Sequence, residues 1–214
     1  MLQRFQGFVA NVLSPAIPGW RVSIGEPVIF KSIGRDADAP PPSYFAGPLN
    51  GILSLDSSIQ EFDLGRWLMR DKMVGVHAFA GLRALPELAK CRRFDSGVLN
   101  PGFSRGVIDN VESSIYGRYG HDIRTAIVGT KGTFMVGSLR LPALEVLKEA
   151  GSGRDMVRHF LAWFADVDLA EMCDFVESVL NSRPPRASAL TAAVSRSPFR
   201  SQRVSYREGR PTRL

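Results

Sequence analysis

The chain has 214 residues, 44% of them hydrophobic, so it can bury a sizeable core and is not expected to be disordered throughout. Its net charge of +6 is local: residues 183–214 hold eight Arg and one acid (+7), and the rest hold 19 basic and 20 acidic residues (−1). A nucleic-acid partner is not expected, because the Arg residues are spread singly with little aromatic interleaving.

Membrane proteins and metal centres are also not expected. No apolar run approaches the roughly 18 residues that span a bilayer, and the first residues make a poor signal peptide. Cys91 and Cys173 lie far apart without metal-ligand spacing, and so do His77, His121 and His159. The sequence therefore predicts a cytoplasmic protein with reduced thiols and no metal.

The first third of the chain alternates between regular elements and breakers. Residues 8–13 predict a short helix, which the string SPAIPGW ends. Residues 25–36 are β-rich, and 37–51 form a long Pro/Gly loop of the kind that often lines a site. A helix is predicted over 57–70.

The rest of the chain predicts an antiparallel meander followed by a long helix over 153–181. The strands are expected at 73–82, 94–103, 106–117, 122–130 and 132–139. One helix, consecutive strands and a final helix describe an α+β fold, with a mostly antiparallel open sheet and helices packed on one face.

The string LDSSIQEFDLGRWL (55–68) contains the most informative polar pattern. Asp56, Gln60 and Asp63 stand at i, i+4 and i+7, which places them on one helical face. A second face holds the apolar residues Ile59, Phe62 and Trp67. Glutamine cannot exchange a proton near pH 7, so the face is catalytic, formerly catalytic or only solvated; as an alternative, Asp56 simply complements the helix dipole.

The motifs that hold dinucleotides are missing from the 214 residues. No G-x-G-x-x-G follows a predicted strand. The string GSGRDM (151–156) lacks the third glycine, and GTKGT (129–133) fits a turn between strands. This chain alone is not expected to bind NAD or NADP.

Five local strings follow one another along the chain: IGEPVIFKSIGRD, LDSSIQEFDLGRWLM, IDNVESSIYGRYGHDIRTAIVGTKGTFMVG, EMCDFVESVLNSRPP and SYREGRPTRL. Together with the order of elements, they resemble the C-terminal α/β domain of the Gfo/Idh/MocA oxidoreductases, most closely the inositol 2-dehydrogenase-like members. The resemblance implies a parent reaction in which NAD or NADP, held by a separate Rossmann domain, oxidises a CH–OH group of a polyol or sugar.

The resemblance also assigns site residues. Asp56 stands at the catalytic aspartate of the family, and Gln60 stands where the family has the histidine that accepts the alcohol proton, so this position is degenerate. Losing a general base typically costs on the order of 10²–10⁴ in rate. The substrate-facing positions of the family fall on Arg35, Asp36, Tyr119 and His121.

Three segments follow from this comparison: a remnant of the interdomain junction (1–23), the substrate and oligomerisation domain (24–185), and a basic C-terminal segment (186–214). The expected function is the substrate side of an NAD(P)-dependent polyol oxidoreductase, truncated and inactive alone. The alternative is a non-catalytic binding module that pairs with its own copy as a homo-oligomer through the open sheet, since 73–82 and 122–130 offer apolar residues in both alternating sets.

Overall fold

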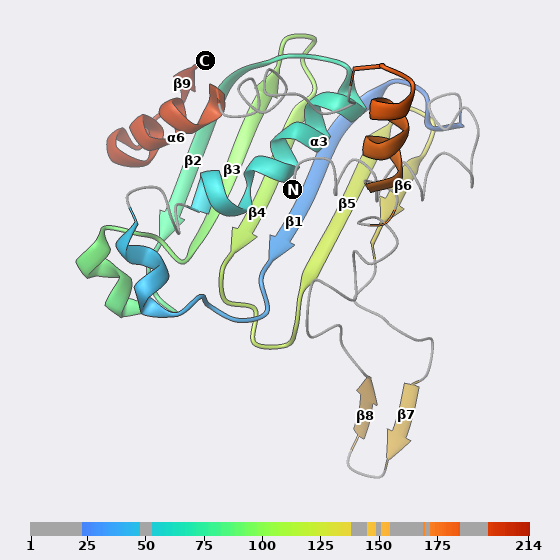
Figure 1. Ribbon diagram of the computed structural model, residues 1–214. Coiled ribbons are helices and arrows are strands. Elements are labelled where there is room, and N and C mark those ends of the chain that lie inside the picture. The colour runs from blue at the N-terminus through green and yellow to red at the C-terminus, as the bar shows by residue number, and fades with distance from the viewer. Residues whose placement is uncertain are drawn as a thin grey trace.

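The protein is described here from a computed structural model (Figure 1). The described residues are 23–47, 53–137, 145–148, 151–154, 169, 172–184 and 197–214. The helix expected at 8–13 and most of the segment expected to join the two domains lie outside these residues.

A seven-stranded sheet is the centre of the fold, with the strand order β6-β5-β1-β4-β3-β2-β9. Its strands are β1 (Pro27–Arg35), β2 (Met73–Gly81), β3 (Ser96–Phe103), β4 (Ile108–Ser114), β5 (Asp122–Gly129), β6 (Thr133–Val136) and β9 (Thr212–Arg213). All neighbours pair antiparallel except β1 and β4, which run parallel. The predicted α+β class with a mostly antiparallel open sheet is confirmed.

The predicted meander is wrong at one place. β2, β3 and β4 form a meander, and β5 and β6 form a hairpin, but β4 and β5 are not neighbours. β1 lies between them, with Arg35 opposite Ser114 of β4 and Asp122 of β5. Because β1 is the central strand, its carboxyl end brings together residues that are about 80 positions apart in the sequence.

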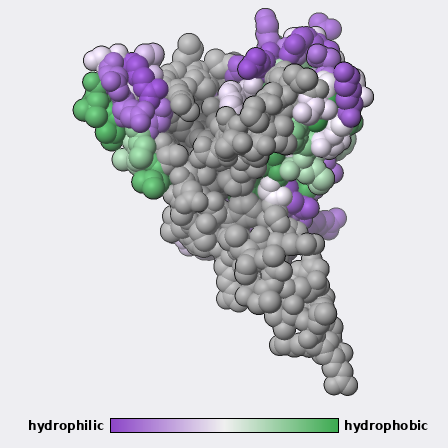
Figure 2. Space-filling view, turned by 90° about the vertical axis from the view of Figure 1, so that its right-hand side faces the viewer, coloured by the Kyte–Doolittle hydropathy of each residue, from purple (hydrophilic) through white to green (hydrophobic). Residues whose placement is uncertain are grey.

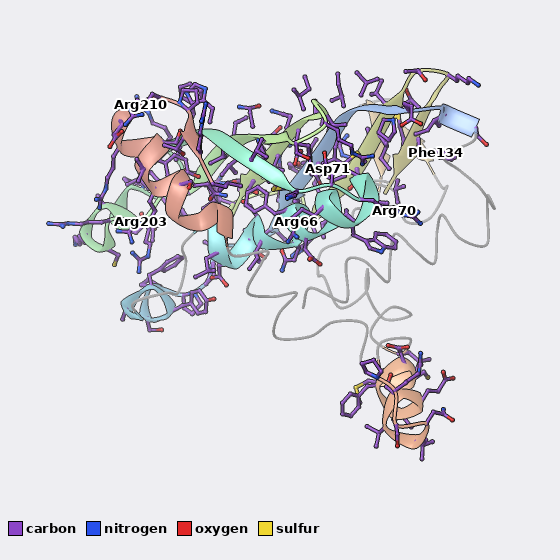
Figure 3. All side chains as sticks on the ribbon, turned by 90° about the horizontal axis from the view of Figure 1, so that it is seen from above. Arg66, Arg70, Asp71, Phe134, Arg203 and Arg210 are labelled. Atoms are coloured by element: carbon purple, nitrogen blue, oxygen red, sulfur yellow. The ribbon has the colours of Figure 1, made fainter. Side chains whose placement is uncertain are left out.

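Helices cover one face of the sheet (Figures 1 and 3). α3 (Ile59–Met69) packs across β1 and β4, and α6 (Ser197–Glu208) packs against β2. Between α3 and the sheet lies a core of fully buried side chains: Phe30, Phe62, Leu64, Met69, Leu99, Val111 and Ile127. Burial of such side chains supplies most of the driving force for folding, at about 25 cal/mol per Å² of apolar surface.

The buried face of α3 differs from the expected one. Phe62 is buried as predicted, but Trp67 is 42% exposed, whereas Glu61 and Asp63 are both 3% exposed. Gly65 is the residue that lets the helix approach the sheet, because a Cβ there would come within 3.2 Å of the Phe30 ring. Spacing alone could not reveal that two carboxyl groups are placed toward the protein interior.

Shorter elements connect these layers. The loop after β1 contains a 3-10 turn, η1 (Pro42–Ala46), and a single π-helical turn, η2 (Leu53–Ser57), leads into α3. A second 3-10 turn, η3 (Pro86–Cys91), follows β2.

The long helix expected at 153–181 is only partly described. Residues 172–180 are helical, but β8 (Gly151–Arg154) pairs with β7 (Glu145–Lys148), so the helix does not begin at 153. The two glycines at 151 and 153 disfavour helix, which accounts for this difference.

The basic C-terminal segment contributes α6 and β9 to the same sheet assembly. Pro198 is the second residue of α6, within the first turn, where a backbone N–H has no helical partner to lose. Gln202 and Ser205 of α6 are fully buried, and the Ser205 hydroxyl accepts a hydrogen bond from the backbone N–H of Ala78 at 3.0 Å.

Candidate functional site

Asp56 lies in η2, immediately before α3, and its carboxylate is held by a tyrosine. The hydroxyl of Tyr44 donates a hydrogen bond to Asp56 Oδ2 over 2.5 Å. This hydrogen bond, together with burial and the negative charges of Asp56 and Asp36, raises the pKa of Tyr44 to about 12. The residue after η2 is anchored to β4, since the hydroxyls of Ser58 and Ser113 lie 2.7 Å apart in the interior. The position of Asp56 is therefore fixed from two sides.

Gln60 is the second residue of α3 and is partly buried. Because Asp56 belongs to the preceding π-helical turn and Asp63 is buried at 3% exposure, the expected polar row does not form a single exposed helical face. Gln60 offers an amide that can donate and accept hydrogen bonds but cannot accept a proton near neutral pH.

His121 and Asp36 meet at the same end of the sheet. His121 precedes β5 and Asp36 follows β1, and the pairing of Asp122 with Arg35 brings these two termini together. The Nε2 atom of His121 lies 3.5 Å from Oδ1 of Asp36. The backbone N–H of Asp36 also donates to Ser114 O at 2.9 Å, which fixes the chain where it leaves the sheet.

Glu61 lies near Asp36, on the face of α3 that packs against the sheet. Burial raises the pKa of Glu61 to about 8, and the charge of Asp36 adds to the increase. A Cβ at Gly34 would lie 2.5 Å from Glu61 Oε1, so the carboxyl group of Glu61 lies directly against β1 and would have to shift if this glycine were replaced. Burial, with a further contribution from the charge of Glu61, also raises the pKa of Asp109.

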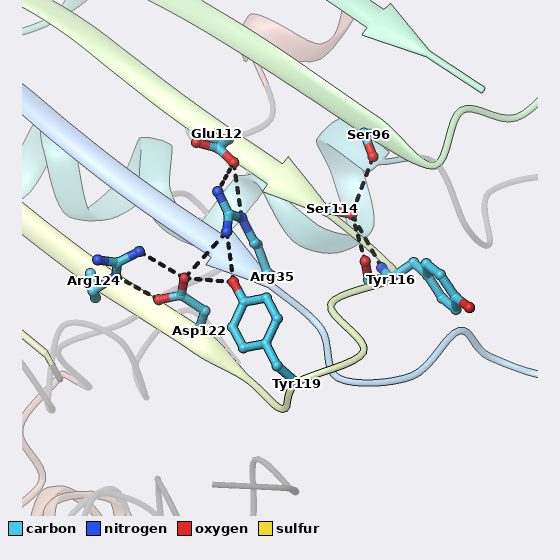
Figure 4. A network of polar contacts seen from close by, with 8 residues as sticks. All are labelled: Arg35, Ser96, Glu112, Ser114, Tyr116, Tyr119, Asp122 and Arg124. Atoms are coloured by element: carbon cyan, nitrogen blue, oxygen red, sulfur yellow. Dashed lines mark hydrogen bonds and ion pairs between the residues drawn. The ribbon is translucent and has the colours of Figure 1, made fainter. Parts of the chain in front are cut away.

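Two other predicted substrate residues lie on the opposite face of the sheet (Figure 4). Arg35 follows Gly34 by one residue, and successive side chains in a strand point to opposite faces. The guanidinium of Arg35 donates to Tyr119 at 2.6 Å and to Glu112 at 2.9 Å. Tyr119 in turn donates to Asp122 at 2.8 Å.

Asp122 is the centre of this second network. It is fully buried and accepts hydrogen bonds from Arg124 at 2.6 and 2.8 Å, with the Arg35 guanidinium 3.6 Å away. Burial raises the pKa of Tyr119, and the hydrogen bond from Arg35 partly offsets this. The charges of the network are largely satisfied among themselves, which is typical of a structural or interface element.

The sheet face opposite α3 also carries an open pocket of about 610 Å³. Its lining combines exposed apolar residues with part of the Arg35 network: Arg35, Phe79, Val98, Glu112, Tyr116 and Tyr119. The six predicted site residues are thus divided between two places. Asp56, Asp36 and His121 share the helix-covered side with Gln60, whereas Arg35 and Tyr119 belong to the open face.

Two side chains on the helix-covered side of the sheet, Tyr44 and Glu61, were not predicted from the sequence as site residues. Tyr44 lies in the Pro/Gly loop that the sequence indicated as a site lining, so its hydroxyl was a recognisable signal. Glu61 follows Gln60 directly, and nothing in its spacing distinguishes it from a solvated helix residue.

The described residues do not fit a dinucleotide or a metal. The one parallel strand pair among them is β1 with β4, and β1 leads into a proline-rich 3-10 turn in place of a glycine-rich turn and a helix N-terminus. In the described part of the chain, no group of three or more His, Cys, Asp or Glu residues is placed to hold a metal ion. No helix in the described ranges is long and apolar enough to cross a bilayer.

Comparison with known proteins places this geometry in context. Residues 22–135, more than half of the chain, match the family model described as the GFO/IDH/MocA C-terminal domain. The scyllo-inositol 2-dehydrogenase (NAD(+)) of Bacillus subtilis is 28% identical over 191 residues, which cover 89% of this chain and 55% of the relative. The myo-inositol 2-dehydrogenase of Thermotoga maritima is 28% identical over 167 residues, covering 78% of this chain and 49% of that protein.

Solved structures agree on the fold. A probable dehydrogenase from Thermotoga maritima superimposes with a TM-score of 0.88 at 25% identity, covering 99% of this chain and 62% of the other. The scyllo-inositol dehydrogenase of Lactobacillus casei, solved with bound NAD(H) and scyllo-inositol, gives 0.82 at 22% identity, with 99% of this chain and 61% of that chain covered. The chain spans about half the length of the curated relatives it matches.

Proposed function

Because the chain belongs to the Gfo/Idh/MocA family through its C-terminal domain, we propose that it forms the substrate side of an NAD(P)-dependent oxidoreductase acting on a polyol of the inositol class. The observation that carries the proposal is a set of two polar pairs, Tyr44 with Asp56 and His121 with Asp36, in which the charge of Asp36 also acts on Tyr44. Carboxylates and an imidazole together can accept and donate hydrogen bonds to several neighbouring hydroxyl groups of a ring polyol.

The same residues support a proposal about activity. The chain alone does not oxidise a polyol, because Gln60 offers no proton acceptor at its position and the described residues do not fit a dinucleotide. NAD or NADP, the cofactors of the family, would be held by residues other than those described.

Amide chemical-shift mapping of the ¹⁵N-labelled chain with myo-inositol tests the binding proposal. The shifts are expected to concentrate at Asp36, Tyr44, Asp56 and His121, and Asp56→Asn should weaken them. Shifts confined to Arg35, Tyr119 and the open face, or no shifts at millimolar myo-inositol, would contradict the proposal.

A second candidate function is a homo-oligomeric binding module that pairs through the open sheet face. Large apolar residues are exposed there: Phe79 (58%), Val98 (38%), Ile108 (58%) and Met135 (78%). Figure 2 views the molecule from the β6 side, so the sheet is seen edge-on, and green hydrophobic atoms lie among purple hydrophilic ones on its right-hand side. An apolar sheet face of this kind favours association with another surface.

A further inference from the structure

The interface between α3 and the sheet contains two carboxyl groups that have no part in the candidate site. Glu61 of α3 and Asp109 of β4 are each only 3% exposed. Among the described residues, no hydrogen-bond partner reaches Oε2 of Glu61 or either oxygen of Asp109. Because an ionised carboxylate without partners is costly to bury, this environment favours the protonated form of both groups.

The two carboxyls lie along one face of α3, and each is close to a glycine. A Cβ added at Gly34 of β1 would lie 2.5 Å from Glu61 Oε1, and one added at Gly65 of α3 would lie 3.4 Å from Asp109 Oδ2. Glu61 and Gly65 stand at i and i+4, so they share a helical face and are separated by about one turn of 5.4 Å. Water could therefore surround these carboxyls only if α3 moved away from the sheet.

The charges that act on this pair are negative. The charge of Asp36, which follows β1 and lies beside His121, acts on Glu61. The charge of Glu61 acts in turn on Asp109. Asp63 is a further buried acid of α3. Ionisation of one member of the pair would therefore be opposed by its neighbours as well as by burial.

The basic side chains of the adjoining elements are placed elsewhere. Lys31 and Arg35 occupy alternate positions of β1 that face away from α3, because Gly34 faces the helix. Arg105 reaches the carboxyl end of α3, where it donates to the backbone carbonyl of Met69 at 2.5 Å. These cations therefore do not compensate a charge on the buried pair.

The pKa values give the direction in which protons move. Burial raises the pKa of Glu61 from 4.5 to about 8, and burial together with the charge of Glu61 raises that of Asp109. Packed α3 therefore keeps these protons at neutral pH, whereas a carboxyl exposed to water at that pH loses its proton. Each opening of α3 thus releases protons, and the opening becomes easier as pH rises toward about 8.

We propose that Glu61 and Asp109 form a pH-sensitive switch: α3 stays packed on the sheet only while both carboxyls carry their protons, and opening of the helix releases these protons to solvent. The switch bears on the candidate site, because Gln60 is the second residue of α3 and Asp56 belongs to the turn before it. The inference goes beyond the polyol-binding proposal, and its test needs no ligand.

Native-state hydrogen exchange of the ¹⁵N-labelled full chain at about pH 5.5 and about pH 7.5 tests the switch. Protection is compared with that of an unstructured peptide at the same pH, for the amides of α3 and of the paired strands β2 and β3. We expect the protection of α3 to fall about tenfold per pH unit for each proton released, and so at least about a hundredfold over this range.

The strands β2 and β3 show whether α3 opens by itself. We expect α3 to be less protected than these strands at both pH values, since a local opening needs less free energy than unfolding of the whole chain. Equal protection of α3 and the strands at both pH values would mean that the helix leaves only on global unfolding, which would overturn the switch.

A double variant removes both protons with little change in side-chain size. In Glu61→Gln combined with Asp109→Asn, the protection of α3 should be the same at the two pH values. Glu87→Gln, a change at an exposed acid of η3, is the matched control and should keep the fall seen in the wild type. A fall that persists in the double variant, or that is missing from the wild type, would overturn the proposal.

A second measurement does not depend on the folding of the variants. Side-chain carboxyl ¹³C spectra of the wild type at about pH 6.5 should show protonated acids at Glu61 and Asp109 and a carboxylate at Glu87. Carboxylate spectra at Glu61 and Asp109 would overturn the switch and leave the proposed polyol-binding function standing.

Discussion

Tyr44 and Asp56 are joined by a hydrogen bond of 2.5 Å between the tyrosine hydroxyl and carboxylate Oδ2. The two residues are 12 positions apart, one in the proline-rich loop after β1 and the other in the π-helical turn before α3. This contact ties the loop to the candidate site, so the loop has a defined part in presenting Asp56.

Tyr44→Phe removes the donor and leaves Asp56 partly buried with one hydrogen bond fewer. A hydrogen bond to a charged group contributes about 1.5–3 kcal/mol, and a partly exposed one falls toward the lower value. We expect the free energy of unfolding, measured in urea, to fall by about 1.5 kcal/mol. Tyr116→Phe is the control, because its hydroxyl contacts the exposed Arg118. Equal losses in the two variants would show that the Tyr44 contact has no special role.

The buried carboxyl of Glu61 predicts how stability changes with pH. Burial raises its pKa from 4.5 to about 8, so the folded chain binds this proton more tightly than the unfolded chain. The stabilisation is fully present below the unfolded pKa and is lost as pH rises toward about 8. The slope is about 1.4 kcal/mol per pH unit.

Glu61→Gln should flatten this slope between about pH 5 and pH 8, which urea unfolding at several pH values would measure. Asp109→Asn should flatten it as well, since burial and Glu61 raise the pKa of Asp109 in the same direction. Glu87→Gln, in the 3-10 turn η3, is the control and should leave the slope unchanged. A stability that rises with pH in the wild type and in Glu61→Gln alike would contradict the buried protonated carboxyl.

In the network around Arg35, we expect a substitution of the buried Asp122 to lower the stability more than a substitution of the partly exposed Glu112. Asp122→Asn removes the buried carboxylate that accepts two hydrogen bonds from Arg124, and hydrogen bonds to charged groups contribute about 1.5–3 kcal/mol. Glu112→Gln removes a carboxylate that is 34% exposed, for which about 0–1 kcal/mol is expected. Thermal unfolding of both variants makes the comparison, and similar losses would contradict the central place of Asp122.

Because the open sheet face exposes apolar residues, we expect it to mediate an oligomer. A single polar substitution on this face should weaken the association. Phe79→Ser on this face should shift sedimentation velocity profiles toward the monomer without lowering the melting temperature of the monomer. Trp67→Ser, a similarly exposed aromatic residue on the helix-covered side, should not change the profile. A wild-type chain that is monomeric at all concentrations would remove the second candidate function.

Much of the fold could be predicted from local pattern, because the strands β2 to β6 and α3 alternate or repeat with the periods of their structures. The place of β1 could not, since pairing between β1 and β5 joins residues about 90 positions apart and has no local signal. Residues 151–154 form a strand, whereas a helix was predicted to begin at 153. The helical spacing of apolar residues after 154 favoured that prediction, although the glycines at 151 and 153 disfavour a helix.

The sequence predicted which residues belong to the candidate site, but it did not predict how they are arranged in space. Arg35 and Asp36 are adjacent in the sequence, yet Arg35 bonds Tyr119 in the network of Figure 4, whereas Asp36 pairs with His121. The alternation of side chains along a strand accounts for the separation of Arg35 from Asp36, whereas Tyr119 and His121 lie two residues apart in the turn before β5, where alternation gives no signal. Burial of Glu61 depends on the packing of α3 over Gly34 and has no counterpart in spacing.

Equilibrium dialysis of the chain against labelled myo-inositol and, in parallel, labelled NAD⁺ tests the central claim most directly, because it asks which half of the reaction these residues recognise. We expect retention of myo-inositol in the millimolar range, lost in Asp56→Asn, and no retention of NAD⁺. Retention of NAD⁺ without retention of myo-inositol would contradict the proposed function.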